Sequence, residues 1–330
     1  MKTFTIYLFI MCCGLIKAQH YQFSQFYAAP LYLNPAFAGA NSCSRLAMNY
    51  RNQWSQVPGT FNSCQVSFDR PLKDLNSGIG ISLFSDKAGV GSLKTTQLNL
   101  FYSYEAKINK RLVARGGLSS GITRRSIDYS QLRFGDQIAR SDAGATLDNT
   151  NNSSLMYFDI GTGYLLYSTN AWGGFSVNHL NRPNQSLHDD NSRLPIEFKF
   201  HGGYKFILNE DSRDSKERQY ITGAINYKKQ LKYNQIDLGA YYTKGHFVLG
   251  LWYRGIPLYK PFEWYENNDA LIFLVGLSTD KLQVGYSFDY TVSSLTVNNT
   301  HGTHEISVSY PFCNKKIKKR KLLLVSCPRF

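Results

Sequence analysis

The sequence lacks the long apolar run that a membrane-spanning helix requires. After residue 18, no apolar stretch reaches the roughly 20 residues that such a helix needs. This absence excludes a helical membrane protein. It leaves a soluble secreted protein or a closed barrel, because open sheet edges cannot face lipid. The chain of 330 residues also lacks a Pro- or Ser-rich linker and any shift in composition, so we expect one folded unit.

Motifs of enzymatic chemistry are also missing. No P-loop or dinucleotide fingerprint is present. The GLSSG at 117–121 matches G-x-S-x-G in letters only, because it falls inside a predicted strand and not at a strand-to-helix turn. His301 and His304 form an H-x-x-H pair without a nearby cysteine or well-placed carboxylate to complete a metal site. We therefore predict no catalytic, cofactor or metal site. A membrane enzyme such as a phospholipase remains a third alternative, but the sequence does not indicate a serine and a histidine that would lie close together.

A secretion leader opens the chain. Residues 1–18 combine a basic start, an apolar stretch and the small residue Ala18, which predicts a signal peptide cleaved before Gln19. The formal charge of +14 falls to +12 once Lys2 and Lys17 leave with it (14 − 2 = 12). Much of the remaining excess lies in the C-terminal tail, so nucleic acid is not needed as a partner.

What is present is a two-faced strand pattern, clearest in KLQVGYSFDY at 281–290. Its apolar side chains fall on one face of an extended strand, and Gln283, Gly285, Ser287 and Asp289 fall on the other. A soluble sandwich can show the same alternation. Here the alternation recurs in long, aromatic-rich strands behind a leader, and the mean hydropathy of −0.32 suits strands that face lipid on one side and a polar lumen on the other. The pattern predicts an all-β fold, a transmembrane antiparallel β-barrel.

We predict fourteen strands, an even number as single-chain bacterial barrels require. They lie near 44–51, 60–69, 77–85, 93–106, 111–124, 154–168, 170–181, 196–208, 217–228, 231–243, 245–255, 268–278, 280–291 and 302–312. The connections between them alternate between the two ends of the barrel. The longest ones, near 125–153, 182–195, 256–267 and 292–301, all fall at one end, as the outer loops of outer-membrane barrels do. The longish connection at 209–216 is the one misfit.

The barrel therefore occupies 44–312, between an N-terminal segment at 19–43 and a basic tail at 313–330. The tail contains Lys318, Lys319 and Arg320 and ends in Cys327-Pro328-Arg329-Phe330. Two interpretations of the tail stay open. It lies against anionic phosphate groups of the inner leaflet, or it is a docking peptide for a periplasmic partner.

The cysteines of the mature chain are Cys43, Cys64, Cys313 and Cys327. Cys64 shares the predicted lipid face with Val66 and Phe68, so we expect it to be unpaired. Barrel closure brings the first and last strands together, which places Cys43 and Cys313 at the same rim. The periplasm permits disulfides. A Cys43–Cys313 bridge and a Cys313–Cys327 bridge are both compatible with the sequence.

The segment after the leader resembles the opening of the PorP/SprF family of type IX secretion outer-membrane proteins. QFSQ at 22–25 is followed by PLYLNPAFAG at 30–39 and by YRNQW at 50–54. The ending at 327–330 is also similar to the family's usual ending. The resemblance covers essentially the whole mature chain and implies an outer-membrane barrel of a Gram-negative bacterium.

In that family the barrel assists export or surface attachment of cargo with a type IX C-terminal signal, as for gliding adhesins, or anchors the periplasmic ring of the secretion motor. The implied partners are outer-membrane lipid, secreted cargo and periplasmic secretion components. A porin or a fatty-acid-type transporter with an N-terminal hatch is the alternative. The resemblance makes Asn34, Pro35 and Gly39, Arg51 and Trp54, and the tail through Phe330 candidate partner-binding residues.

The N-terminal segment is too apolar to hang free in the periplasm. Its aromatic residues are Phe23, Phe26, Tyr27, Tyr32 and Phe37. Asn34-Pro35 favours a turn, because proline disfavours the helical region for the residue before it. We expect the segment to fold into or across the periplasmic mouth and to plug the lumen in part. An ordered cap without a gating role is the alternative. For Trp54, a place in an interfacial aromatic belt is the simplest interpretation.

Overall fold

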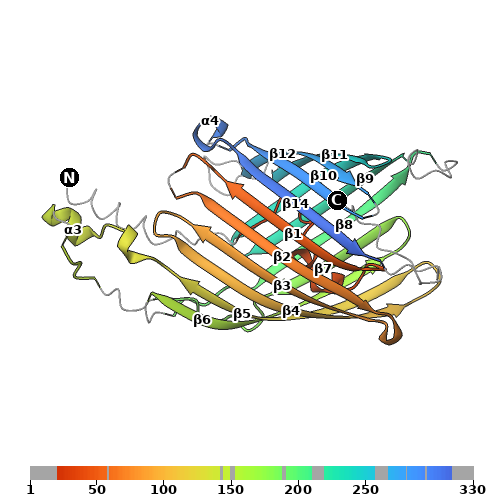
Figure 1. Cartoon of the computed structure of the whole chain (residues 1–330), viewed down its shortest axis with the longest axis horizontal. Coiled ribbons are helices and arrows are strands. Elements are labelled where there is room, and N and C mark those ends of the chain that lie inside the picture. The colour runs from red at the N-terminus through yellow and green to blue at the C-terminus, as the bar shows by residue number, and fades with distance from the viewer. Residues whose placement is uncertain are drawn as a thin grey trace.

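The computed structural model describes residues 21–57, 59–141, 144–148, 153–187, 191–209, 219–256, 267–279, 281–293 and 296–313. Fourteen antiparallel strands close into one barrel in which each strand pairs with its neighbours in sequence and β1 pairs with β14 (Figure 1). The prediction of a fourteen-stranded antiparallel barrel is confirmed. The strands are β1 Ser44–Gln53, β2 Phe61–Leu72, β3 Ser77–Ala88, β4 Leu93–Lys107, β5 Val113–Ser126, β6 Ser154–Tyr167, β7 Ala171–Asn178, β8 Glu197–Ile207, β9 Gln219–Gln230, β10 Tyr233–Lys244, β11 Phe247–Ile256, β12 Asn267–Ser278, β13 Gln283–Thr291 and β14 Thr303–Phe312.

Alternation along each strand separates an apolar outer face from a polar inner one. On β14, Ile306, Val308 and Tyr310 are exposed on the outside, whereas Glu305 and its inward neighbours are buried in the lumen. The same two-faced pattern runs through β4, β6, β8 and β13. A continuous exposed apolar surface of this kind suits lipid and not water.

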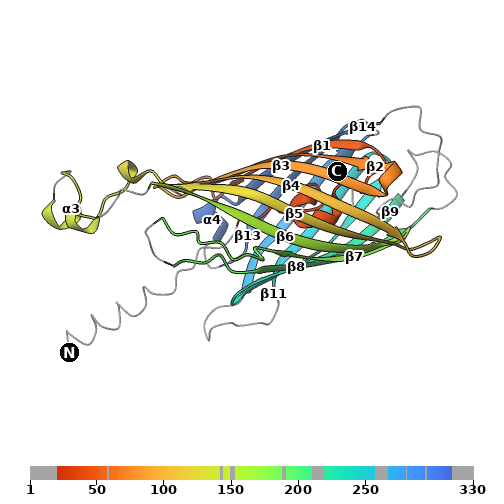
Figure 2. The same cartoon turned by 90° about the horizontal axis from the view of Figure 1, so that it is seen from below.

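The two ends of the barrel differ. The strand ends that flank the four longest connections, after β5, β7, β11 and β13, all lie at one end of the barrel, which we call the long-loop rim. The opposite end, the short-turn rim, carries tight turns at 168–170 and 245–246, together with the end of β8 and the start of β9. The predicted asymmetry is present. A lobe containing η4 (Tyr129–Gln131) and α3 (Gly135–Arg140) projects beyond the strands at the long-loop rim, as Figure 2 shows.

Strand β7 is shorter than predicted. It ends at Asn178 and not near 181, because His179 (φ 61°) and Arg182 (φ 46°) adopt left-handed backbone that a strand cannot continue through. Beyond the end of β7, the turn at 179–182 supplies a hydrogen bond to the backbone of β6. The Leu180 N–H donates to the Ile160 carbonyl at 3.0 Å.

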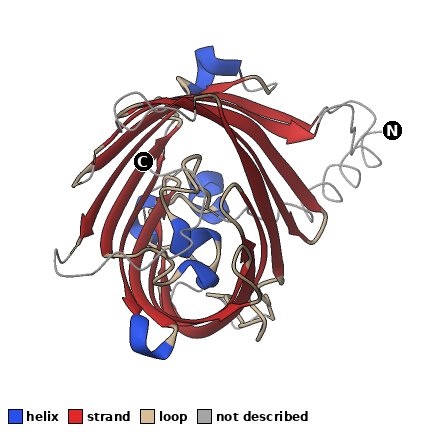
Figure 3. Cartoon of the chain, turned by 90° about the vertical axis from the view of Figure 1, so that its right-hand side faces the viewer, coloured by secondary structure: helices blue, strands red, loops and turns tan. Residues whose placement is uncertain are grey.

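The core of the molecule is the lumen. Figure 3 looks along the barrel, and helical turns and loops lie inside the ring of strands. They include α2 (Pro30–Leu33) and η2 (Pro35–Phe37), which precede β1. Residues 21–43, which we call the plug, therefore fill space that the strands enclose.

Candidate functional site

The plug folds through two short turns set by its prolines. Pro30 occupies the first turn of α2, where its missing N–H costs no hydrogen bond. Asn34 is extended (φ −160°, ψ 127°), as a residue before proline prefers to be. Its side-chain oxygen accepts a hydrogen bond from the Ala36 N–H at 2.9 Å and so caps η2. The LNPA sequence therefore encodes a compact double turn.

A buried carboxylate on β14 holds the start of the plug. The Glu305 carboxylate accepts hydrogen bonds from two successive backbone groups, the Ser24 N–H at 2.7 Å and the Gln25 N–H at 2.9 Å. The Ser24 hydroxyl donates to Asp289 on β13 at 2.6 Å. Hydrogen bonds to charged groups are stronger than neutral ones. This part of the plug is thus fixed by charge-assisted bonds to the last two strands.

Two arginines neutralise these carboxylates. The Arg51 guanidinium lies 3.0 Å from Asp289 and 3.2 Å from Glu305, and it also donates to the Ser24 hydroxyl. Arg254 on β11 contacts Asp289 at 3.0 Å and Asp237 on β10 at 2.8 Å. All of these side chains are buried, and unpaired buried charges would be costly. We call Arg51, Arg254, Asp237, Asp289 and Glu305 the anchor cluster.

Gln25 extends the anchor along the same wall. Its side-chain amide donates to the Ser287 hydroxyl at 3.2 Å and to the Glu305 carbonyl at 3.0 Å, and its oxygen accepts from Ser307 at 2.6 Å. A Cβ on Gly285 would lie 2.5 Å from that oxygen, so the glycine makes room for the glutamine. Ser24 and Gln25 of the QFSQ signature therefore have specific hydrogen-bond partners on the lumen wall.

The opposite wall binds the middle of the plug. The Asn34 amide nitrogen donates to the carbonyls of Tyr164 on β6 and Phe175 on β7 at 3.1 and 3.0 Å, and lies 3.1 Å from the His201 ring. Gly117 and Gly163, which lie opposite each other on β5 and β6, leave space for the Asn34–Ala36 part of the plug. A Cβ on Gly117 would lie 2.3 Å from the Ala36 nitrogen, and one on Gly163 would lie 2.1 Å from the Asn34 side-chain oxygen.

The end of the plug is fitted equally closely. Gly39 has φ +60°, and a Cβ there would lie 2.7 Å from the Arg70 carbonyl oxygen. Its N–H donates to Asp69 at 3.0 Å. The Arg115 guanidinium on β5 donates to the carbonyls of Ala36 at 3.1 Å and Ala38 at 2.7 Å, and pairs with Glu105 at 2.7 Å. Glycine is required at position 39 for both its conformation and its contacts.

Aromatic side chains fill the volume between the polar bonds. The Phe26 and Trp252 rings pack edge to face with centroids 4.9 Å apart, and those of Tyr27 and Trp172 do so at 5.7 Å. At the far end, Tyr21 stacks on Phe84, and burial raises the pKa of the Tyr21 phenol. A cavity of about 60 Å³ next to Tyr21 has room for little more than water.

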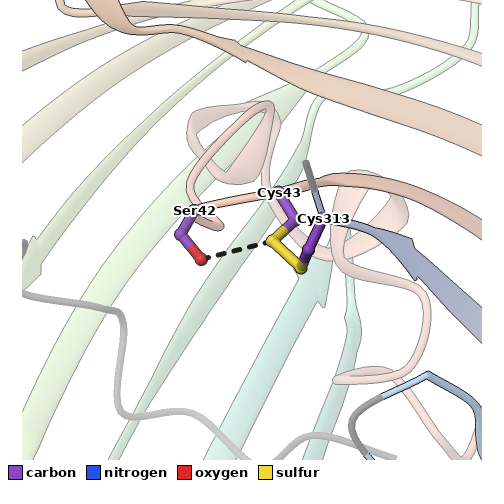
Figure 4. Close-up of a disulfide and its surroundings, with 3 residues drawn as sticks. All are labelled: Ser42, Cys43 and Cys313. Carbon is purple, nitrogen blue, oxygen red and sulfur yellow. Dashed lines mark hydrogen bonds between the residues drawn. A yellow bond between two sulfur atoms is a disulfide. The ribbon is translucent and has the colours of Figure 1, made fainter. Parts of the chain in front are cut away.

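A disulfide joins the plug's exit to the end of the barrel. Cys43 and Cys313 are bonded at the short-turn rim (Figure 4), next to the pair Ser44–Phe312 where β1 and β14 close the sheet. Of the two pairings left open by the sequence, the structure contains this one. Cys64 on β2 is free, as predicted.

The structure places Asn34, Pro35, Gly39 and Arg51 in the lumen, where all four are buried, although Arg51 lies on the wall opposite the one that binds Asn34. Trp54 is separate from them. It lies at the long-loop rim, where its backbone N–H donates to the Gly302 carbonyl at 3.0 Å and its ring contacts Phe61. The tail residues Lys318, Lys319, Arg320, Cys327, Pro328, Arg329 and Phe330 lie outside the described residues, as does the predicted leader at 1–18.

Sequence reasoning missed the acidic half of the anchor. The strand pattern predicts only that Asp289 lies on the polar face, and it does not single out Glu305, Asp237 or Arg254 as its neighbours in a cluster. The available signal was a charged residue at a lumen-facing position of a strand, since such a charge needs a buried partner. The alternation marked these positions, but it does not say which charge meets which across the barrel.

Two further features bear on the chemistry. GLSSG at 117–121 lies within β5, as predicted. No group of three or more His, Cys, Asp or Glu side chains suited to a metal ion occurs among the residues that the structure describes.

None of the helices in the described ranges is long and apolar enough to cross a membrane.

Solved barrels resemble the chain in outline. The Pseudomonas putida toluene transporter TodX has 12% sequence identity and a TM-score of 0.48, over 85% of this chain and 93% of that one. The Acinetobacter baumannii outer membrane protein Omp33 has 8% identity and a TM-score of 0.43, over 83% and 100%. A Pseudomonas aeruginosa FadL homologue has 12% identity and a TM-score of 0.43, over 85% and 93%.

At the level of sequence, no curated protein matches the chain. A family model described as "Type IX secretion system membrane protein PorP/SprF" matches residues 15–310. This match spans the plug and nearly all of the barrel. The chain therefore belongs to the PorP/SprF family of type IX secretion system membrane proteins.

Proposed function

We propose that this barrel is a non-enzymatic accessory of type IX secretion in the outer membrane, where it assists export or cell-surface attachment of cargo with a type IX C-terminal signal. Family membership supports the secretion context. We further propose that the long-loop rim faces the cell exterior and the short-turn rim faces the periplasm, since outer-membrane barrels have long outer loops and short periplasmic turns.

The observation that carries the proposal is the attachment of the plug to both walls of the lumen. Ser24 and Gln25 are bonded to β13 and β14, and Asn34 is bonded to β6 and β7 on the other side. Most of the plug is buried. A lumen occupied in this way suits a protein that acts through its two rims and not one that passes solutes.

The rims then have separate tasks. At the long-loop rim, the lobe around α3 exposes Ile138 and Leu147, at 60% and 83% of their surface, and it is a candidate contact for cargo. At the periplasmic rim, the basic tail at 313–330 is our candidate for docking periplasmic secretion components. Lys318, Lys319 and Arg320 would supply positive charge for binding, and the last four residues would be recognised specifically by the partner.

A comparison of secreted and surface proteins between wild type and a clean deletion tests this function. Loss of one or a few proteins with type IX C-terminal signals supports a dedicated export or attachment role. Loss of all of them supports anchoring of the motor ring. An unchanged secretome and surface would defeat the proposal, and ion conductance of the purified barrel would then favour a substrate channel.

Two variant genes, each used to complement the deletion, test the roles of the two rims separately. One encodes a chain truncated after Cys313, and the other replaces Ile138 and Leu147 by serine. We expect the truncation to impair assembly with periplasmic components and the serine variant to impair cargo recovery at the surface. Equal membrane levels of both barrels, measured by immunoblot, are the control.

A further inference from the structure

Three basic side chains gather on the outer face of the barrel at the long-loop rim. They are Lys87 on β3, Lys94 on β4 and Arg124 on β5, and all three are exposed. Each belongs to the lipid-facing alternation of its strand, in line with Leu83, Leu98 and Ile122 respectively. We call them the basic cluster.

The sheet register fixes how close they are. Lys87 lies directly opposite Lys94. Arg124 lies opposite Thr96, two residues along β4 from Lys94. Directly opposed side chains have Cβ atoms about 4.5–5.5 Å apart, and diagonal neighbours are about 7–8 Å apart. The three cationic groups can therefore reach one common point above the sheet.

Hydroxyl groups surround the cations on the same outer face. Ser85 lies opposite Thr96, which in turn lies opposite Arg124 on the next strand. Ser126 lies opposite Lys94. Arginine, lysine and hydroxyl donors together form the chemistry of a phosphate site.

The placement along the strands indicates which phosphate. The apolar band of these strands ends at Leu83, Leu98 and Ile122, which are 52%, 45% and 50% exposed. Arg124 is the next outward residue on β5, and the two lysines lie two outward positions beyond the band. The cluster thus stands immediately above the lipid tails, at the depth of lipid headgroups.

The positive charge of the cluster is only weakly balanced by its surroundings. Like charges directly opposite each other destabilise a sheet. None of the three makes an ion pair or hydrogen bond with another residue in the part of the chain that the structure describes. The carboxylate near Lys87 is Asp128, which accepts two hydrogen bonds from Ser130. These bonds, with Lys87 as a minor contribution, lower the pKa of Asp128.

We propose that the basic cluster binds the phosphate groups of lipid A in the outer leaflet. This proposal relies on the orientation given under Proposed function. An anionic headgroup at this depth would neutralise the opposed lysines and accept bonds from Arg124 and the hydroxyls. Bound lipid would fix the barrel beside the lobe that carries α3.

Lys229 on β9 offers a matched control. It is also exposed, faces outward and lies near the long-loop rim, but its neighbours on the adjacent strands are Asn234 and Phe198. It has the same charge, but no cation lies directly opposite it on either adjacent strand.

The test is native mass spectrometry of the full mature chain in detergent, titrated with phosphorylated lipid A, the same lipid A after dephosphorylation, and phosphatidylglycerol. We expect the wild type to bind phosphorylated lipid A at least tenfold more tightly than the other two. The triple variant K87Q/K94Q/R124Q should lose that preference, and K229Q should keep it. Thermal melting without lipid shows whether the triple variant is folded.

Equal binding of phosphorylated lipid A by the wild type and a folded triple variant would overturn the proposal. A preference for phosphatidylglycerol would overturn it as well, and would indicate an inner-leaflet position for this rim. Labelling of a cysteine introduced at Leu147 on intact cells reports the orientation independently. Failure of the lipid site is thereby distinguished from failure of the proposed topology.

Discussion

Arg51 on β1 and Glu305 on β14 lie directly opposite each other in the sheet, with the guanidinium 3.2 Å from the carboxylate. Their strands are the first and the last, so the pair bridges the seam at which the barrel closes. The same carboxylate accepts the backbone N–H groups of Ser24 and Gln25. One side chain therefore connects barrel closure with plug attachment.

Replacing Arg51 by glutamine should destabilise the barrel strongly. It would leave Asp289 and Glu305 with one fewer cation in a buried site, and removal of one partner of a buried pair costs about 3–5 kcal/mol. Urea unfolding of the detergent-solubilised protein, followed by tryptophan fluorescence, measures the change. Arg140→Gln is the control, since its ion pair with Asp136 lies at the surface of the lobe, where such pairs contribute little to stability. Equal midpoints for the two variants would refute a structural role for the anchor cluster.

Gly117→Ala should displace the plug, whereas Gly116→Ala should not. A Cβ at 117 would lie 2.3 Å from the Ala36 backbone nitrogen, which cannot rotate away, and a Cβ at 116 meets nothing within 4 Å. Overpacking of this kind costs about 1–3 kcal/mol. Chymotrypsin cleavage at Phe23, Phe26, Tyr27 and Phe37 of the plug, which are buried in the wild type, reports the displacement. Identical cleavage of the two alanine variants would mean that the plug is not seated against β5.

Asn34→Ala removes the donor to two backbone carbonyls and the cap of η2 together. A lost hydrogen bond that leaves buried groups without partners costs about 1–3 kcal/mol. We expect faster hydrogen exchange in residues 30–40 and a lower unfolding midpoint. Asn191→Ala, at an exposed loop position, is the control. Unchanged exchange in the plug would show that the Asn34 bonds do not hold it.

The strands could be predicted because alternation has a period of two and is set by the two media on either side of a barrel wall. The end of β7 could not be predicted because His179 adopts a left-handed backbone conformation, which the residue type does not indicate. Within the site, QFSQ and LNPAFAG pointed to a folded segment near the lumen. The partners of Ser24 and Asn34 lie 265 and 130 residues away in sequence, and only the barrel's closure brings them together.

The disulfide predicts a specific thiol count. If the leader is cleaved as the sequence predicts, four cysteines remain, and the bond between Cys43 and Cys313 should leave two thiols open to alkylation (4 − 2 = 2). Alkylation of the unreduced protein followed by mass spectrometry counts them, and three or four would contradict the bridge.

The bridge should also stabilise the seam, because it closes a loop with a sequence separation of 270 residues and so limits the unfolded chain. A native disulfide of this kind contributes about 2–5 kcal/mol. Cys43→Ser and Cys313→Ser should each lower the unfolding midpoint by the same amount, and the double variant should lower it no further, since either change breaks the same bond. Cys64→Ser, which breaks no bond, is the control and should unfold like the wild type. Additive losses in the double variant would mean that the two cysteines act separately and that the bridge does not hold the seam.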